Sequence, residues 1–267
     1  MRKSDYGMFC LRRYAWNAPT AAAGVILGML MAFSSRVSSY MGAFDILGGL
    51  QNAYIIGLSA YIAPAVICFP HVMRFAEERA QGYGTFRMLR GSRMGYARRS
   101  LAEAMLSGGA VMLIAVAVYM LFVAAWCGTH GMVVTCNGDG FFGDVYNAMD
   151  TIYYGWVMSG MGAAVYAVNV LFLVFYAMFW SVAGTVISAF VSNRRVAVAA
   201  PFLFKRFLEY LIPDSLFFLL PSNLRMSAWV VDLPGGGIWY GFLYVGISFL
   251  IGLVVLLVKL LHESVKG

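Results

Sequence analysis

Charged residues are scarce in this sequence. They make up 12% of its 267 residues, and hydrophobic residues make up 61%, whereas soluble domains usually carry roughly 25% charged residues. Apolar stretches of about 20 residues, the length that a helix needs to cross a bilayer, recur along the whole chain. The composition excludes an ordinary soluble domain and predicts a helical membrane protein with several spans.

Catalytic and cofactor motifs are also lacking. The three histidines, His71, His130 and His262, are dispersed and form no H-E-x-x-H motif. The sequence contains no G-x-x-x-x-G-K-[ST] phosphate loop and no G-x-S-x-G nucleophile motif. We therefore expect no active site, metal or cofactor in this chain, and any energy must come from an ion gradient or from another protein.

The basic residues lie at the ends of the apolar runs. The net charge is +7, seven arginines fall between Arg74 and Arg99 after the second run, and Arg194 and Arg195 follow the fourth. Cytoplasmic loops of membrane proteins are enriched in lysine and arginine. This placement indicates membrane topology and argues against nucleic acid as a partner.

Six spans fit both the apolar runs and the basic residues. Gly155 to Val191 holds 37 residues without charge, so either an outer helix leads into one span or two spans form a hairpin. A single crossing keeps most basic residues on one side and both termini in the cytoplasm. No small-residue cleavage site follows the first run, which we expect to stay as an anchor. The expected spans are about 15–33, 52–72, 101–127, 163–191, 196–212 and 238–261.

Two cysteines lie in the loop expected on the oxidising side. Cys127 and Cys136 enclose eight residues, and a disulfide between them is one interpretation. Two unpaired thiols are the other.

The segment Phe75 to Leu101 reads F-A-E-E-R-A-Q-G-Y-G-T-F-R-M-L-R-G-S-R-M-G-Y-A-R-R-S-L. It resembles the first cytoplasmic loop of type-2 ATP-binding-cassette exporter permeases, where a carboxylate, a glycine, a hydrophobic-basic stretch and R-x-x-Y precede span three. Residues 179–201 are similar to the short turn between spans four and five of that family. One departure is that arginine stands where the family often has lysine before span three. The matching positions are Glu77 or Glu78, Gly82, Phe86 to Leu89, Arg93, Tyr96, Arg98 and Arg99.

The resemblance implies a cytoplasmic coupling helix that docks on an ATPase subunit. Tyr83, Phe86 and Leu89 fall at i, i+3 and i+6, which gives one apolar face. Gly82 and Gly84 interrupt the helix. An interfacial helix that lies on anionic lipid, with no protein partner, is the alternative. Polar flanks for ionic contacts would come from Glu77, Glu78, Arg79 and Arg87.

Span five contains three charged residues. Lys205 and Glu209 stand at i and i+4 and can neutralise each other on one helix face, with Arg206 beside them. Charge inside a membrane indicates function by default, so the pair is expected to line a pathway at a dimer interface. A structural bridge or side chains that snorkel to the interface are the alternative.

The stretch from Pro213 to Gly237 is apolar but interrupted by proline and asparagine. Its pieces are too short to cross, so they predict re-entrant segments before span six, or otherwise a hydrophobic outer loop. The resemblance as a whole implies an export permease of the bacterial cytoplasmic membrane. It would pair with a second permease subunit and with separate ATPase subunits that bind ATP and Mg²⁺. A membrane scaffold or sensor, and a gradient-driven carrier that uses Lys205 and Glu209, are the alternatives.

Overall fold

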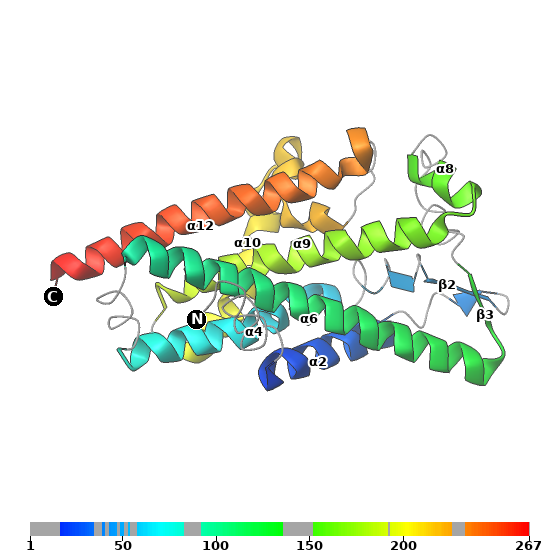
Figure 1. The fold of residues 1–267 in the computed structure, drawn as a ribbon, viewed down its shortest axis with the longest axis horizontal. Coiled ribbons are helices and arrows are strands. Elements are labelled where there is room, and N and C mark those ends of the chain that lie inside the picture. Colours follow the sequence, from blue (N-terminus) through cyan, green and yellow to red (C-terminus); the bar gives the residue numbers. More distant parts are fainter. Residues whose placement is uncertain are drawn as a thin grey trace, which may run out of the picture.

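Helices dominate the computed structural model of this protein (Figure 1). The structure describes residues 17–34, 39–40, 43–46, 49–50, 53, 58–82, 92–135, 152–191, 193–225 and 233–266. The α-helices of these residues are α2 (Ala18–Ser34), α4 (Leu58–Ala80), α6 (Arg93–His130), α8 (Ile152–Met158), α9 (Gly162–Ser188), α10 (Arg194–Leu211) and α12 (Ile238–Lys266).

Three helices are long and apolar enough to cross a membrane. These are α6, α9 and α12, with 38, 27 and 29 residues. At about 1.5 Å per residue they extend roughly 57, 40 and 44 Å, which exceeds the roughly 30 Å of a hydrocarbon core. The prediction of a helical protein is therefore confirmed, and three of its helices are candidate membrane spans, while the count of six spans and their orientation stay predictions.

The other three expected spans are shorter or more polar. α2 is apolar but has only 17 residues. α4 contains Pro64 and Pro70 and carries charged residues in its last two turns. It also begins and ends later than the expected span 52–72. α10 includes Lys205, Arg206 and Glu209 within its 18 residues. α4 and α10 would each need neighbouring helices to pair their charged groups inside a bilayer.

Helix α6 begins at Arg93, before the span start expected near Leu101. Ser92 caps its N-terminus, because the Ser92 hydroxyl accepts a hydrogen bond from the Gly95 N–H at 2.9 Å. Gly131 ends the helix in the left-handed conformation, with φ of 63°. The basic residues Arg93, Arg98 and Arg99 therefore belong to the first turns of a continuous helix.

The fourth apolar region forms one long helix in the described residues. α8 has seven residues, too few to cross, and a turn at Gly160 with φ of 82° leads from it to α9. Of the two arrangements open from sequence, the structure has a short helix followed by one long helix and no hairpin of two spans in residues 152–191.

Helix α9 is the centre of the bundle, with 61% of its most apolar window buried against 22% for α12. Glycines allow close contacts between the helices of the bundle. A Cβ on Gly108 of α6 would lie 2.6 Å from the Ala177 oxygen of α9, and a Cβ on Gly28 of α2 would lie 2.6 Å from the Ala115 oxygen of α6. Small residues at helix contacts are typical of membrane helix packing. The largest fully buried side chains include Trp180, Tyr119, Tyr176 and Phe172.

The outer surface of the bundle is apolar. Exposed large hydrophobic residues follow α12 over its length, and others lie on α2, α6 and α10. A soluble domain of this size would rarely expose such continuous apolar faces, so this surface fits contact with lipid. On α12 the exposed residues are Trp239, Phe242, Leu243, Ile247, Leu250, Ile251, Val254, Val258 and Leu261.

The expectation of an all-α chain misses a small sheet. The strands β1 (Ser39–Tyr40), β2 (Ala43–Asp45) and β3 (Val133–Thr135) form a sheet in that order. β1 and β2 are antiparallel, and β2 and β3 are parallel. β3 follows the Gly131 turn directly and consists of β-branched residues, which favour extended structure. The sheet lies beyond the end of α2 and beside the last turns of α6, at the right of Figure 1.

The segment before α12 forms short 3₁₀ helices: Asp214–Leu219, Pro221–Arg225 and Pro234–Gly237. Two tyrosines of α12 hold the first of them. The Tyr240 hydroxyl donates to the Phe218 oxygen at 2.6 Å, and the Tyr244 hydroxyl to the Leu219 oxygen at 2.7 Å. Leu224 is fully buried. These pieces pack on the bundle, and their re-entry into a membrane stays a prediction.

Candidate functional site

The ends of several helices meet at one end of the bundle, at the left of Figure 1. α4 and α12 end there, and α6 begins there. Contacts between α4 and the end of α9 and the start of α10 join the same region. We call this region the charged end. It is defined by Arg74, Glu77, Glu78, Arg79, Arg93, Arg98, Arg99, Glu103, Arg194, Arg195 and Lys259.

Ion pairs connect the last turns of α4 to the rest of the charged end. Arg74 Nη2 lies 3.2 Å from Glu78 Oε1 within α4. Arg194 Nη1 lies 3.3 Å from Glu77 Oε1, which links α10 to α4. The Arg194–Glu77 pair is exposed, and exposed pairs contribute little to stability. They do fix which helix ends are neighbours.

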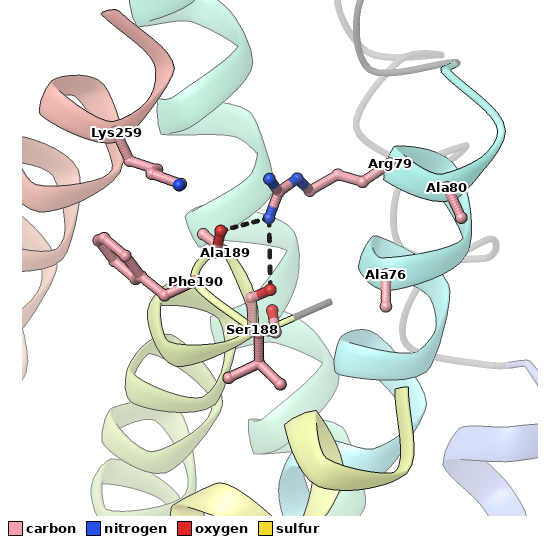
Figure 2. Close-up of a pocket in the computed structure, with 8 residues that line it drawn as sticks. Ala76, Arg79, Ala80, Ser188, Ala189, Phe190 and Lys259 are labelled. Atoms are coloured by element: carbon pink, nitrogen blue, oxygen red, sulfur yellow. Dashed lines mark hydrogen bonds between the residues drawn. The ribbon is translucent and has the colours of Figure 1, made fainter. Parts of the chain in front are cut away.

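Arg79 joins the end of α4 to the end of α9 (Figure 2). Its Nη1 donates hydrogen bonds to the Ser188 oxygen at 3.3 Å and to the Ala189 oxygen at 2.5 Å. The last carbonyl groups of a helix have no partner within the helix and carry partial negative charge, so a cation there is stabilising. Arg79 therefore ties α4 and α9 together.

A buried hydrophobic cluster lies beneath these charges. Phe75 of α4 and Tyr96 of α6 stack with ring centroids 6.4 Å apart, and Leu101, Leu256 and Leu260 belong to the same cluster. The cluster brings α4, α6 and α12 together where the segment between α4 and α6 begins and ends. The two helix ends that flank this segment are therefore packed against each other.

A buried carboxylate is paired in the first turns of α6. Arg99 Nε lies 2.7 Å from Glu103 Oε1, and Glu103 is buried. An arginine one turn away offsets the cost of burying the charge.

The predicted coupling residues fall on both sides of the limit of the described structure. Glu77 and Glu78 belong to the end of α4. Gly82 has φ of 69° and stands in the turn that follows, where only glycine adopts this conformation without strain. The remaining predicted coupling residues lie outside the described residues: Tyr83, Phe86, Arg87 and Leu89.

A second group of charges lies on α10. Lys205 Nζ is 3.3 Å from Glu209 Oε1, and Arg206 Nη1 is 3.2 Å from Glu209 Oε2. Both cations also lie over the ring of Tyr61, at 5.4 Å and 4.3 Å from its centroid. Such cation–π contacts are attractive. Lys205, Arg206, Glu209 and Tyr61 form what we call the α10 cluster.

The burial pattern of α10 is the reverse of that in a soluble helix. Lys205 is 4% exposed, whereas Phe207 is 57% and Tyr210 95% exposed. Apolar groups outside and a charge inside fit a helix that faces lipid or another subunit. Tyr61 and Arg79 stand at opposite ends of α4, about 27 Å apart along the helix, so the α10 cluster and the charged end are separate sites.

The two cysteines of the expected disulfide are not both described. Cys127 is buried in α6 as a free thiol, and Cys136 lies outside the described residues. The disulfide stays a prediction.

Lys259 is a site residue that the sequence did not single out. It lies at the charged end, and its Nζ is 5.3 Å from the centroid of Phe190. The only sequence signal was its position at the end of an apolar run. A basic residue at that position indicates membrane topology and gives no information on a binding partner.

Comparisons with known proteins give no family for this chain. No protein-family model matches it, and the searches of curated proteins and of solved structures found no significant match. What its own residues define is a helical protein with three helices long and apolar enough to cross a membrane, a charged end and a separate buried charge cluster.

Proposed function

We propose that this chain is the membrane-spanning subunit of an ATP-driven exporter of the type-2 ATP-binding-cassette kind. It would lie in a bacterial cytoplasmic membrane with the charged end facing the cytosol. A second permease subunit, the same or a similar chain, would complete the translocation pathway. Two separate ATPase subunits would bind ATP and Mg²⁺ and supply the energy.

The observation that supports this proposal most is the anchoring of the connection between α4 and α6. Phe75 of α4 stacks on Tyr96 of α6. Glu77 of α4 pairs with Arg194 of α10. Arg79 holds the end of α9. A displacement of the connection would therefore act on α4, α6, α9 and α10 together, because packed helices move as rigid elements. A segment through which an ATPase subunit moves the permease needs this property.

The α10 cluster fits the same proposal as part of the pathway wall. A second subunit that covers the apolar outer face of α10 would enclose Lys205 and Glu209 near the interface between subunits. The alternative structural role, an ion pair that fastens α10 to α4 through Tyr61, makes use of the same contacts.

Co-purification tests the proposal. The chain is produced together with any P-loop ATPase that is encoded beside its gene, and the membrane fraction is solubilised and purified in detergent. A triple variant, Y83A/F86A/L89A, is expected to lose the ATPase subunit, because these residues would fill the docking groove. The matched control is L243A/I247A/L250A on the exposed face of α12, which should keep it. An ATPase subunit retained by the first variant, or no neighbouring ATPase gene, would count against the exporter.

A gradient-driven carrier is the second candidate, and the burial of Lys205 beside Glu209 favours it. A carrier would transport its cargo in liposomes that contain this chain alone and an ion gradient. An exporter subunit would not. A scaffold or sensor would show neither this transport nor ATPase-dependent export.

A further inference from the structure

A groove of about 510 Å³ runs along α6 where this helix meets α9. The first and last of its lining residues on α6 are Leu106 and Leu121, which lie about 22 Å apart along the helix axis. Val174 and Met178 of α9 form one wall. The other described lining residues belong to α6: Gly109, Ala110, Leu113, Ile114, Ala117 and Val118.

Small residues of α6 keep this groove open. Gly109 is buried, and a Cβ there would lie 3.2 Å from Met178 Cε and 3.6 Å from Val174 Cγ1. The two helices therefore approach closely at Gly109, as small residues allow. Ala110 and Ala117 add only methyl groups to the lining.

Helix α2 packs on the other side of the groove without filling it. Its Gly24 and Gly28 lie against Ile114 and Val118, two side chains that also line the groove. Leu121 at the end of the groove is 71% exposed. The groove therefore lies between two helix contacts of α6 and opens toward the outside of the bundle.

The groove occupies the part of α6 that is expected inside the hydrocarbon core. Leu106 follows Arg99, a basic residue of the first turns, by about 10 Å along the helix. From Arg99 to Leu121 the helix extends about 33 Å, close to the roughly 30 Å of the core. Since each leaflet supplies about half of that thickness, the groove is long enough for a whole acyl chain.

The chemistry of the lining excludes a polar ligand. Every described residue of the lining is apolar, so these side chains offer neither a charge nor a hydrogen bond. Water does not fill apolar cavities, and an empty groove would lose dispersion contacts along both walls. Inside a bilayer, the hydrocarbon chains of lipids are the apolar material that can restore these contacts.

The size of the groove argues against a second copy of this chain as its occupant. Ten described residues line it, whereas a stable protein interface uses about 20 to 30 residues on each side. Its volume lies within the range of about 300 to 1,000 Å³ that is typical of small-molecule sites. Met178 in its wall has a flexible side chain that adapts to irregular apolar shapes.

We propose that this groove holds one acyl chain of a membrane phospholipid more firmly than the rest of the outer surface does. The chain lies lengthwise along α6, from Leu106 to Leu121, and contacts Val174 and Met178 of α9. The shape of the groove selects the chain, and the headgroup has little influence. The site requires α6 and α9 to lie in a bilayer and does not depend on an ATPase partner.

Photochemical labelling of the full-length chain tests this site. The chain is reconstituted at one copy per lipid nanodisc with phosphatidylcholine that carries a diazirine within one acyl chain, and labelled peptides are identified by mass spectrometry. The label should concentrate on α6 between Leu106 and Leu121 and on Met178. The reference is the exposed apolar face of α12, which should be labelled less per exposed residue. Equal labelling of the groove and α12 would indicate ordinary lipid contact and overturn the site.

Ala117→Phe places a phenyl ring in the groove, because Ala117 is an exposed residue of its lining. Labelling of α6 should fall to the level of α12, and labelling of α12 should not change. Ala125→Phe is the matched control, since Ala125 is also an exposed alanine of α6 but does not line the groove. Unchanged labelling of α6 in a folded Ala117→Phe chain would overturn the site.

A second copy as occupant is tested in vesicles by raising the ratio of protein to lipid. Labelling of the groove relative to α12 should stay constant. A selective fall at the groove would show that another copy covers it, and would overturn the acyl chain as the occupant.

Discussion

Phe75 and Tyr96 stack across the base of the connection between α4 and α6. Their ring centroids lie 6.4 Å apart at an interplanar angle of 22°, and both side chains are buried. His71 extends the stack at 6.3 Å from Phe75. Phe75 lies near the end of α4 and Tyr96 in the first turn of α6, so this contact clamps together the two helix ends that flank the connection.

Removing one ring should loosen the clamp. Phe75→Ala is expected to lower the free energy of unfolding by about 3 kcal/mol, the usual cost of deleting a buried phenyl ring. Thermal unfolding of the purified chain in detergent measures this. Tyr96→Phe is the control and should unfold near the unaltered temperature, because it keeps the ring. Equal stability of Phe75→Ala and the unaltered chain would contradict the packing of this cluster.

Glycines of α2 form a second close contact that substitution can test. A Cβ on Gly24 would lie 2.6 Å from Ile114 Cβ, and one on Gly28 would lie 2.6 Å from the Ala115 oxygen. Gly24 and Gly28 are spaced as in G-x-x-x-G, a motif of close helix contacts in membranes. Gly24→Ala and Gly28→Ala should each separate α2 from α6 and lower the unfolding temperature.

Gly246→Ala is the matched control for these variants. It lies within α12, and a Cβ there meets no atom within 4 Å. Alanine favours helix over glycine by about 1 kcal/mol, so this variant should unfold at the same or a higher temperature. A similar loss in all three variants would show that the contact between α2 and α6 is not the cause.

Local spacing predicted some of the structure and missed contacts between distant segments. The apolar runs sufficed for the long helices α6, α9 and α12, because length and hydropathy are local properties. The same spacing placed Lys205 and Glu209 on one face of α10. Tyr61, which lies beneath Lys205 and Arg206, is on another helix, and nothing in the sequence pairs them.

Helix limits were less predictable where charge and apolar sequence overlap. The expected second span ended near Val72, but α4 continues to Ala80, because Arg74–Glu78 and the contact of Arg79 with α9 stabilise two further turns. Hydropathy alone ends a span at its first charges. Tertiary partners decide whether the helix continues.

Removing one charge of the buried Lys205–Glu209 pair of α10 should destabilise the protein more than removing both. Glu209→Gln leaves Lys205 buried without its carboxylate, which is expected to cost about 3 kcal/mol of unfolding free energy. Lys205→Met together with Glu209→Gln removes both charges and should recover most of this loss. Chemical denaturation in mixed micelles compares the variants.

Arg206→Gln is the control for the buried pair. Arg206 bonds the same carboxylate, but its side chain is 50% exposed against 5% for Lys205. Its loss should therefore change the unfolding free energy by at most about 1 kcal/mol. If Arg206→Gln lowered the unfolding free energy as much as Glu209→Gln, the exposed Arg206–Glu209 bond would be the stabilising one. That result would contradict the importance of the buried Lys205–Glu209 pair.

Orientation in the membrane can be tested at the two ends of α6. Ser92 caps its start at the charged end, and Val133 follows its end and is exposed. In a chain whose four cysteines are replaced by serine, Ser92→Cys should resist a membrane-impermeant maleimide in intact cells and react after permeabilisation. Val133→Cys should react in intact cells, because about 57 Å of helix separates the two ends and exceeds the bilayer core. Labelling of Ser92→Cys from outside would reverse the orientation and remove the charged end from the reach of any cytosolic ATPase.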